Sequence, residues 1–282
     1  MGQTKGSNFV TRTLSGIVLL VVVVGAVLWS PWTFALLLMA ICGGALWEFY
    51  GMAEKKGLRP HKWMAIVLGI IAVGAWTAYY NWALMLYVTI AIPIVLLCPF
   101  AMIAIELYRK HDNPMSNIGI TFLGLIYIAV PLCLFGFLYI AVGKESEDMG
   151  VWAILWYIFI IWMNDIGAYL FGVAFGRHRL FERISPKKSW EGFFGGLLVG
   201  IGTGVAAALI MGWDVWFWAG LGAVAVVSGV FGDLVESMFK RSAGVKDSGN
   251  LIPGHGGMLD RFDALIFSIP FVFVYFLIFA SL

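Results

Sequence analysis

The apolar run IVLLVVVVGAVL occupies residues 17–28 and contains no charged side chain. A helix needs about 20 mostly apolar residues to cross the hydrocarbon core of a bilayer, and the segment around this run is long enough. Eight further segments have the same character, so that nine candidates lie at residues 12–29, 31–50, 63–80, 83–105, 118–142, 151–172, 192–212, 214–231 and 262–281. The pattern predicts an all-α polytopic membrane protein with about nine transmembrane helices.

The composition of the whole chain agrees with this fold class. Of the 282 residues, 61% are apolar and 12% are charged, whereas a soluble domain carries charge on roughly a quarter of its residues. One soluble core could not enclose so much apolar surface, so the bilayer must be the solvent for most side chains. The first run follows Lys5 and Arg12 as a signal peptide would, but its length and Pro31 indicate an uncleaved anchor.

The positive charges mark one side of the predicted membrane region. With nine spans, 17 of the 18 Lys and Arg residues fall in the N-terminal segment and in the loops that follow even-numbered spans. The exception is Lys144, which lies in an acidic stretch. Because cytoplasmic loops carry the excess of Lys and Arg, the pattern predicts a cytoplasmic N-terminus and a C-terminus on the outer side.

A stripe of small residues runs along the seventh predicted span. Its members recur at multiples of four and are Gly192, Gly196, Gly200, Gly204, Ala208 and Gly212. Such a stripe lets another backbone approach closely, so it indicates a packing face, in this chain or in a second copy. The alternative is the general glycine richness of membrane helices.

Acidic residues at the ends of the last two spans are candidate functional groups, because charge inside or beside a span is costly. If the eighth span continues as a helix, it has one polar face made of Asp233, Glu236, Ser237 and Lys240. Asp260 and Asp263 stand one turn apart at the entrance to the ninth span. Mg²⁺ is bound by one or two carboxylates together with substrate phosphates, so these acids indicate a magnesium site. A second metal that assists in-line displacement at phosphorus is also possible.

Ion pairing is the alternative explanation, because four cations lie nearby: Lys240, Arg241, Lys246 and Arg261. A glycine loop favours a ligand instead. Gly254, Gly256 and Gly257 surround His255, and they would let backbone N–H groups approach an anion as phosphate-binding loops do. We interpret His255 first as a phosphate contact, second as a general acid or base, and last as a metal ligand.

The loop before the seventh span carries complementary positive charge. Lys187 and Lys188 stand just before Ser189, whose side chain is suited to cap the next helix. Glu191 falls in the first turn of that helix, where the helix dipole favours an acid.

Three polar residues interrupt apolar spans. Asn164 and Asp165 lie in the sixth span, and they indicate a polar pocket or a buried pair rather than exposure to lipid. Glu48 lies at the cytoplasmic end of the second span, where we interpret it as a side chain that reaches the interface.

Several of these motifs resemble one enzyme family. The stretch 237–263 contains Ser237-Met238-Phe239-Lys240-Arg241, Lys246-Asp247 and the segment from His255 to Asp263. It resembles the signature of the phosphatidate cytidylyltransferases (CDP-diacylglycerol synthases) along its full length. Asn164-Asp165, residues 185–192 and the region of Glu48 are also similar to that family. The resemblance covers most of the chain and is strongest after residue 150.

The resemblance implies an enzyme that joins CTP to phosphatidic acid, making CDP-diacylglycerol and pyrophosphate for phospholipid biosynthesis. It implies a nine-helix homodimer in a membrane, for a bacterium the inner membrane, with a Mg²⁺-dependent site open to the cytoplasm and the bilayer. The implied partners are CTP and bilayer phosphatidic acid, with no nucleic acid. The implied metal ligands are Asp233, Asp260 and Asp263.

The chemistry of that reaction suggests the remaining roles. A phosphomonoester has a second pKa of about 6, so the lipid phosphate is already largely a dianion and needs no strong base. It does need relief from repulsion and correct orientation. We therefore predict phosphate contacts from Lys187, Lys188, Lys240, Arg241, Lys246 and Arg261, with Lys240 and Arg241 counted as catalytic. We predict binding or supporting roles for Glu236, Ser237, Asp247, Asn164, Asp165, His255, Gly256 and Gly257.

The predicted organisation has two parts, an N-terminal membrane region at residues 1–150 and a catalytic region at residues 151–282, with cytoplasmic loops at 173–191 and 232–261. Two other functions stay open. A CTP-dependent lipid kinase of the polyprenol type would transfer the γ-phosphoryl group instead. An ion-coupled transporter would place its acids near the midplane, whereas here they gather at one surface.

Overall fold

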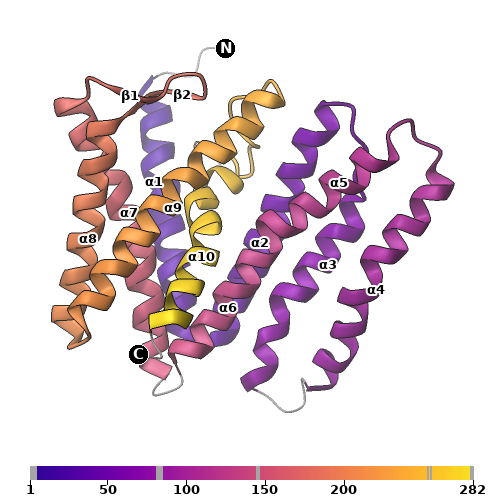
Figure 1. Ribbon diagram of the computed structural model, residues 1–282, viewed down its shortest axis with the longest axis horizontal. Coiled ribbons are helices and arrows are strands. Elements are labelled where there is room, and N and C mark those ends of the chain that lie inside the picture. Colours follow the sequence, from indigo (N-terminus) through magenta and orange to yellow (C-terminus); the bar gives the residue numbers. More distant parts are fainter. Residues whose placement is uncertain (1–4, 81–84, 144–146, 253, 255, 280–282) are drawn as a thin grey trace. The chain divides into compact units, whose positions relative to one another are not determined.

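The chain is helical along most of its described length in a computed structural model (Figure 1). The structure describes residues 5–80, 85–143, 147–252, 254 and 256–279. Its helices are α1 (Lys5–Trp29), α2 (Pro31–Lys55), α3 (Lys62–Gly74), the 3₁₀-helix η1 (Ala75–Tyr80), α4 (Met85–Arg109), α5 (Pro114–Gly124), the π-helical turn η3 (Leu125–Ala129), α6 (Val130–Val142), α7 (Glu147–Phe175), α8 (Trp190–Met211), α9 (Val215–Ser242) and α10 (Leu259–Phe279). Two short strands, β1 (Arg179–Phe181) and β2 (Ser185–Ser189), pair antiparallel.

The helices account for the apolar segments of the sequence. In the described part of the chain, seven helical segments are long and apolar enough to cross a bilayer, and two shorter apolar helices cover Thr13–Trp29 and Lys62–Thr77. In its described residues, each of the nine predicted segments therefore lies mainly in helix. The all-α polytopic membrane fold is confirmed, while the count of nine spans and the direction of the chain stay predictions.

The structure differs from the predicted loops in two places. Helix α9 continues to Ser242, so most of the first half of the predicted loop 232–261 is helical. Lys240 and Arg241 lie in its last turn, where cations interact favourably with the helix dipole. Within the predicted loop 173–191, β1 and β2 form a hairpin. A 2.9 Å hydrogen bond from the amide of Trp190 to the carbonyl of His178 follows the ladder.

The chain forms two compact units. The first contains Met1–Phe137 and Ser242–Phe262, and the second contains Leu138–Arg241 and Asp263–Leu282. The predicted boundary at residue 150 concerns function and stays a prediction.

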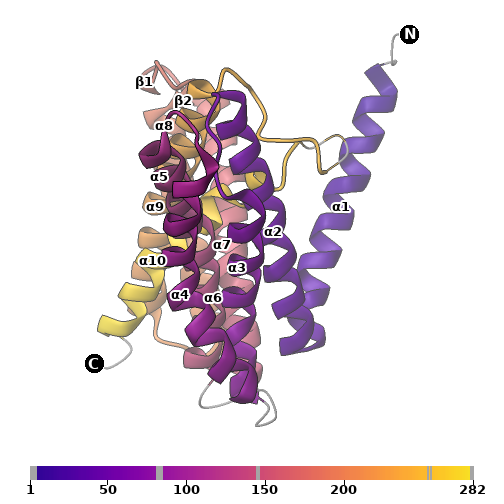
Figure 2. The ribbon, with the colours of Figure 1, turned by 90° about the vertical axis from the view of Figure 1, so that its right-hand side faces the viewer.

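In the first unit, a tight turn joins α1 to α2. The hydroxyl of Ser30 accepts a 3.1 Å hydrogen bond from the amide of Trp32, and Pro31 occupies the first turn of α2, where a missing N–H costs nothing. Thr33 donates to the carbonyl of Ala26 at 2.7 Å, which ties the turn back onto α1. The two helices meet at this end and separate toward the N-terminus of α1 (Figure 2).

A buried polar cluster, made of His61, Glu106, Arg109, Asn117 and Thr121, also holds the first unit together. The Glu106 carboxylate is 2.8 Å from Nε2 of His61 and 2.9 Å from Nη1 of Arg109, and it accepts a 2.9 Å hydrogen bond from Asn117. Thr121 accepts a 2.9 Å bond from the amide of His61. Burial, and then the positive charge of Arg109, lowers the pKa of His61. The cluster fixes the start of α3 against α4 and α5.

In the second unit, the glycine stripe of α8 is a packing face, as predicted. A Cβ at Gly192 would lie 2.8 Å from the carbonyl oxygen of Ala168 in α7. A Cβ at Gly200 would overlap Val226 of α9, and one at Gly204 would overlap the Trp218 carbonyl. The partners of the stripe are therefore α7 and α9 of the same chain.

Close packing also joins α9 to α10 in the second unit. A Cβ at Gly232 would stand 2.6 Å from Cβ of Phe267 and 2.8 Å from the carbonyl oxygen of Asp263, so only glycine fits without a shift. Near the other end of α10, the hydroxyl of Tyr275 donates a 3.0 Å hydrogen bond to the carbonyl of Phe217. These contacts hold α10, from Asp263 onward, along α9.

Candidate active site

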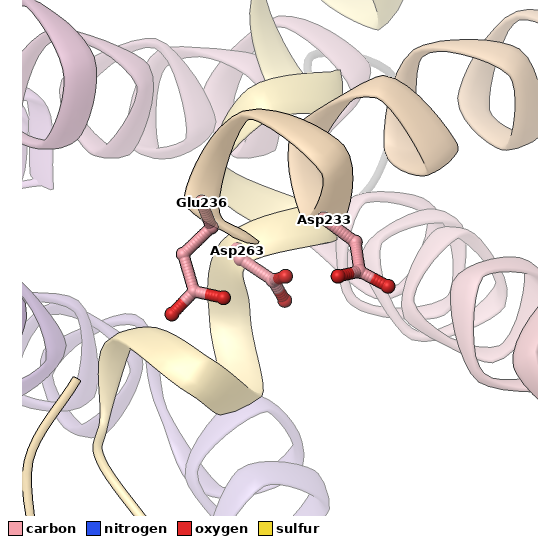
Figure 3. A group of neighbouring side chains, drawn as sticks. All are labelled: Asp233, Glu236 and Asp263. Carbon is pink, nitrogen blue, oxygen red and sulfur yellow. The ribbon is translucent and has the colours of Figure 1, made fainter. Parts of the chain in front are cut away.

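Three carboxylates meet where α9 and α10 pack together. Asp233 and Glu236 stand one turn apart on α9, and Asp263 projects between them from α10 (Figure 3). One ligand oxygen from each lies within 4.8 Å of the others. Glu236 and Asp263 are buried, and Asp233 is partly exposed. We call these three residues the acidic cluster.

Two lysines face the acidic cluster. Nζ of Lys240 is 2.5 Å from the carboxylate of Glu236, whose side chain is only 1% exposed. Nζ of Lys188 is 2.5 Å from Oδ2 of Asp233. The hydroxyl of Ser237 donates a 3.3 Å hydrogen bond to Oδ1 of the same aspartate. Two positive charges thus oppose three carboxylates, and the ion pairs predicted as the alternative to metal binding are present in part.

A cavity of about 370 Å³ opens beside Asp233. This volume lies within the usual range for a small-molecule site. Five elements (α7, β1, β2, α8 and α9) supply its lining residues, which are Asn164, Asp165, Ala168, Tyr169, Gly172, Val173, Leu180, Lys187, Lys188, Ser189, Gly192, Phe193, Gly229, Val230 and Asp233. The cavity therefore brings together five predicted site residues from α7, β2 and α9: Asn164, Asp165, Lys187, Lys188 and Asp233.

The hairpin and the start of α8 position the two cavity lysines. Ser189 caps α8 as predicted, since its hydroxyl accepts a 3.1 Å hydrogen bond from the amide of Gly192. The carboxylate of Glu191 accepts hydrogen bonds from the amides of Arg177 and His178 at 3.1 and 3.3 Å. These hydrogen bonds join the segment before the hairpin to the first turn of α8, and they limit the movement of the backbone that carries Lys187 and Lys188.

Two further carboxylates, Glu48 and Asp260, organise the glycine loop between α9 and α10, within the first unit. Glu48 of α2 accepts 2.9 Å hydrogen bonds from the Ser248 hydroxyl and from the amides of Met258 and Leu259. A Cβ at Gly257 would overlap that carboxylate. The interpretation of Glu48 as an interfacial side chain was wrong, because the residue is 3% exposed and caps the start of α10.

Asp260 belongs to the same loop. Its Oδ2 accepts hydrogen bonds from the amides of Gly257 and Ser248 at 2.8 and 3.0 Å. Gly256 has a φ of 90°, a backbone conformation that favours glycine. A Cβ there would lie 2.9 Å from Oδ2 of Asp260. The carboxylate therefore shapes the loop, whereas Asp233 and Asp263, the other two predicted ligands, lie in the acidic cluster.

The remaining predicted site residues have less defined surroundings. Arg241, Lys246 and Arg261 are exposed, and His255 lies outside the described residues. Sequence reasoning missed the role of Glu48 in organising the glycine loop of the first unit. It gave Glu236 a supporting role, and the spacing of three residues between Asp233 and Glu236 was the signal for its place in the acidic cluster.

The acidic cluster fits a divalent cation. Hard cations such as Mg²⁺ take oxygen ligands, and two ligands on opposite sides of Mg²⁺ stand about 4 Å apart, close to the spread of the three oxygens. The buried positions of Glu236 and Asp263 would exclude much of the water that competes for these oxygens.

A larger cavity of about 540 Å³ lies toward the opposite ends of α7, α9 and α10 in the second unit, beside Tyr157, Phe217 and Phe276. Its walls are mostly apolar. Its one carboxylate among the described lining residues, Asp214, accepts a hydrogen bond from the amide of Phe217 at the start of α9. This cavity therefore offers no comparable set of groups for chemistry.

Comparison with known proteins agrees with the geometry. A model of the "Cytidylyltransferase family" matches residues 10–279. Proteins named phosphatidate cytidylyltransferase from Staphylococcus aureus (strain COL) and Staphylococcus epidermidis (strain ATCC 12228 / FDA PCI 1200) are each 42% identical over 150 residues, and that from Staphylococcus saprophyticus is 39% identical. Each match covers 51% of this chain and 58% of the relative, so the chain spans less than two thirds of the relatives it matches. The family match, which extends over nearly the whole sequence, shows that the chain belongs to the cytidylyltransferase family.

Proposed function

We propose that the protein is a CTP:phosphatidate cytidylyltransferase, which makes CDP-diacylglycerol and pyrophosphate. The observation that carries the proposal is the cavity lined by Lys187 and Lys188 of the hairpin and by Asp233 of the acidic cluster, in which Lys188 pairs with Asp233. Two phosphate-bearing substrates need cations to reduce their mutual repulsion, and a divalent metal needs carboxylates, and the cavity offers both. The names of the similar proteins supply the substrates, CTP and phosphatidic acid.

The reaction joins two anions. An oxygen of the lipid phosphate attacks the α-phosphorus of CTP, the bond between the α-phosphorus and the oxygen that bridges to the β-phosphorus breaks, and pyrophosphate departs with that electron pair. The lipid phosphate is largely a dianion near neutral pH, so no side chain has to remove a proton from it. Lys187 and Lys188 would hold the phosphates in line and neutralise charge, which positioning and electrostatic stabilisation require.

We assign the divalent cation, Mg²⁺, to Asp233 and Asp263, with Glu236 as the third carboxylate of the acidic cluster and Lys240 as its ion-pair partner. When bound, Mg²⁺ supplies charge stabilisation to the phosphoryl oxygens. We assign Asp260 to the support of the glycine loop, because Oδ2 already accepts two backbone hydrogen bonds. Ser237 would orient Asp233, and Asn164 and Asp165 would form the wall of the cavity.

The site would face the cytoplasm, which is the source of CTP. Support comes from the distribution of charge, in which 17 of 18 Lys and Arg residues fall on one side of a nine-span arrangement. The seven long apolar helices and the two shorter ones are compatible with nine spans. The relatives are bacterial proteins, so the proposed location is the inner (cell) membrane of a bacterium. A homodimer is an expectation from the family resemblance.

The test uses the purified chain with phosphatidic acid vesicles and CTP labelled separately at the α- or γ-phosphate. We expect the α label in the lipid product and the γ label in pyrophosphate. Transfer of γ label to lipid would instead identify a CTP-dependent lipid kinase and reject the proposal. Glu54→Gln, which removes a carboxylate at an exposed ion pair with Lys62, is the control for unspecific effects.

A further inference from the structure

The ion pair between Lys188 and Asp233 involves a carboxylate that the proposed cation would need. Oδ2 of Asp233 is 2.5 Å from Nζ of Lys188, and Oδ1 accepts the 3.3 Å hydrogen bond of Ser237. Each oxygen of this carboxylate therefore already has one partner. A carboxylate oxygen keeps a second lone pair for a metal, so a cation that binds Asp233 would lie beside these partners.

Charge decides which partner leaves. The hydroxyl of Ser237 is neutral and comes from the same helix, so it can keep orienting the carboxylate beside a cation. An ammonium group within a few ångströms of a divalent cation is repelled, and the aspartate can no longer compensate for both. The side chain of Lys188 is 27% exposed, so it has room to move.

The surroundings of Lys188 restrict where it can go. Ser189, the next residue, is buried and fixed as the cap of α8, so the backbone cannot move far and the flexible side chain must turn. Lys188 and Asp233 both line the 370 Å³ cavity. A lysine released from Asp233 therefore stays within reach of an anionic group in that cavity.

We propose that Lys188 is the cation that neutralises Asp233 in the metal-free protein, and that metal binding exchanges it from Asp233 to a substrate phosphate. This inference rests on the proposed function, from which it takes the metal and the phosphates. The exchange couples the two events, because a site without metal withholds Lys188 from the nucleotide. Metal binding at Asp233 thus makes the ammonium group of Lys188 available to a substrate phosphate in the cavity.

Lys187 provides a matched comparison. It is the adjacent residue, lines the same cavity and carries the same charge, but it makes no ion pair within the described residues. General electrostatic effects of a bound cation act on both lysines. Only Lys188 is expected to be released by it.

The experiment measures amine labelling of the full chain in nanodiscs without nucleotide, using an N-hydroxysuccinimide ester and peptide mass spectrometry. Saturating Mn²⁺ should raise the labelling rate of Lys188 severalfold and leave that of Lys187 within twofold. In Asp233→Asn, Lys188 should label rapidly without metal. Unchanged Lys188 labelling at full Mn²⁺ occupancy, measured by electron paramagnetic resonance, overturns the exchange while leaving the proposed reaction intact.

Mn²⁺ affinity supplies the second measurement. Lys188→Met should strengthen Mn²⁺ binding about threefold to fivefold, the range expected when a partly exposed competing ion pair is removed. Lys187→Met should change it less. Equal effects of the two substitutions overturn the exchange. If Asp233→Asn leaves Mn²⁺ affinity unchanged, the metal assignment fails as well, which separates that failure from a lysine that does not move.

Discussion

The hydroxyl of Ser248 donates a 2.9 Å hydrogen bond to the carboxylate of Glu48, a residue 200 positions earlier in the chain. The same carboxylate accepts the amides of Met258 and Leu259 at the start of α10. One buried acid from the second predicted span therefore fixes both ends of the glycine loop. Three hydrogen-bond donors depend on it, so Glu48 is a central structural residue of the first unit.

Replacement of Glu48 should destabilise this unit strongly. Glu48→Ala leaves three donors without an acceptor, and each buried unsatisfied group costs about 1–3 kcal/mol. Glu48→Gln keeps one acceptor oxygen and should lose less. Thermal unfolding in detergent measures both, with Glu54→Gln on the same helix as the control, since its exposed ion pair with Lys62 contributes at most about 1 kcal/mol. Equal melting temperatures for Glu48→Ala and the control would contradict the capping role.

The two aspartates of α10 should behave differently. Asp263→Asn removes a buried carboxylate of the acidic cluster, so turnover should fall by orders of magnitude, since the electrostatic role of a metal is worth several kcal/mol. Asp260→Asn should retain most of the Mn²⁺ affinity and lose stability, because its main contacts are backbone amides of the glycine loop. A Mn²⁺ titration of both variants measures which of the two aspartates contributes to metal affinity. Loss of metal binding in a stable Asp260→Asn protein would restore Asp260 as a ligand.

The glycine stripe predicts a position-dependent effect of a bulky residue. Gly200→Leu would place a side chain into Val226 of α9, and overpacking of this kind typically costs about 1–3 kcal/mol. Gly202 lies on the same helix, is exposed, and has no described atom within 4 Å of an added Cβ. Gly202→Leu is therefore the matched control and should leave thermal stability nearly unchanged. Similar losses of thermal stability in both variants would contradict a close-packing role for the glycine stripe.

The buried His61 should make stability depend on pH. Its pKa is lowered from the ordinary value of 6.5 by burial first and by Arg109 second, so the unfolded chain takes up a proton more readily than the folded one. The contribution of His61 to the free energy of unfolding is then fully present above about pH 6.5 and decreases as the pH falls below that value. Melting temperatures measured between pH 7.5 and 5.5 should fall more in the wild type than in His61→Gln. Parallel curves would show that other groups cause the loss.

The proposed orientation has a direct test by cysteine labelling. In a background without Cys42, Cys98 and Cys133, a reagent that cannot cross the membrane should modify a cysteine at Asp214 from outside but not one at Lys56. Ser146, which is also predicted to lie on the outer side, falls outside the described residues and serves as a second labelling position. The reverse pattern would reverse the orientation and separate the site from cytoplasmic CTP.

The sequence by itself determined the features that depend on neighbours along the chain. Hydropathy alone indicates the helices, since each segment must satisfy its backbone hydrogen bonds within itself when lipid surrounds it. The spacing of Asp233 and Glu236 placed both on one face of α9, and the position of Ser189 predicted its cap on α8. The period of four in α8 predicted a close-packed face, although it could not name the helices that fill it.

Only the tertiary structure decided which carboxylate serves which purpose. Asp260 and Asp263 look equivalent in the sequence, yet one accepts backbone amides of the glycine loop and the other lies between Asp233 and Glu236. Glu48 and Ser248, and likewise Lys188 and Asp233, meet through the folding of distant segments. A buried carboxylate needs hydrogen-bond donors or cations wherever the fold provides them, and those partners come from packing between helices, which no local pattern specifies.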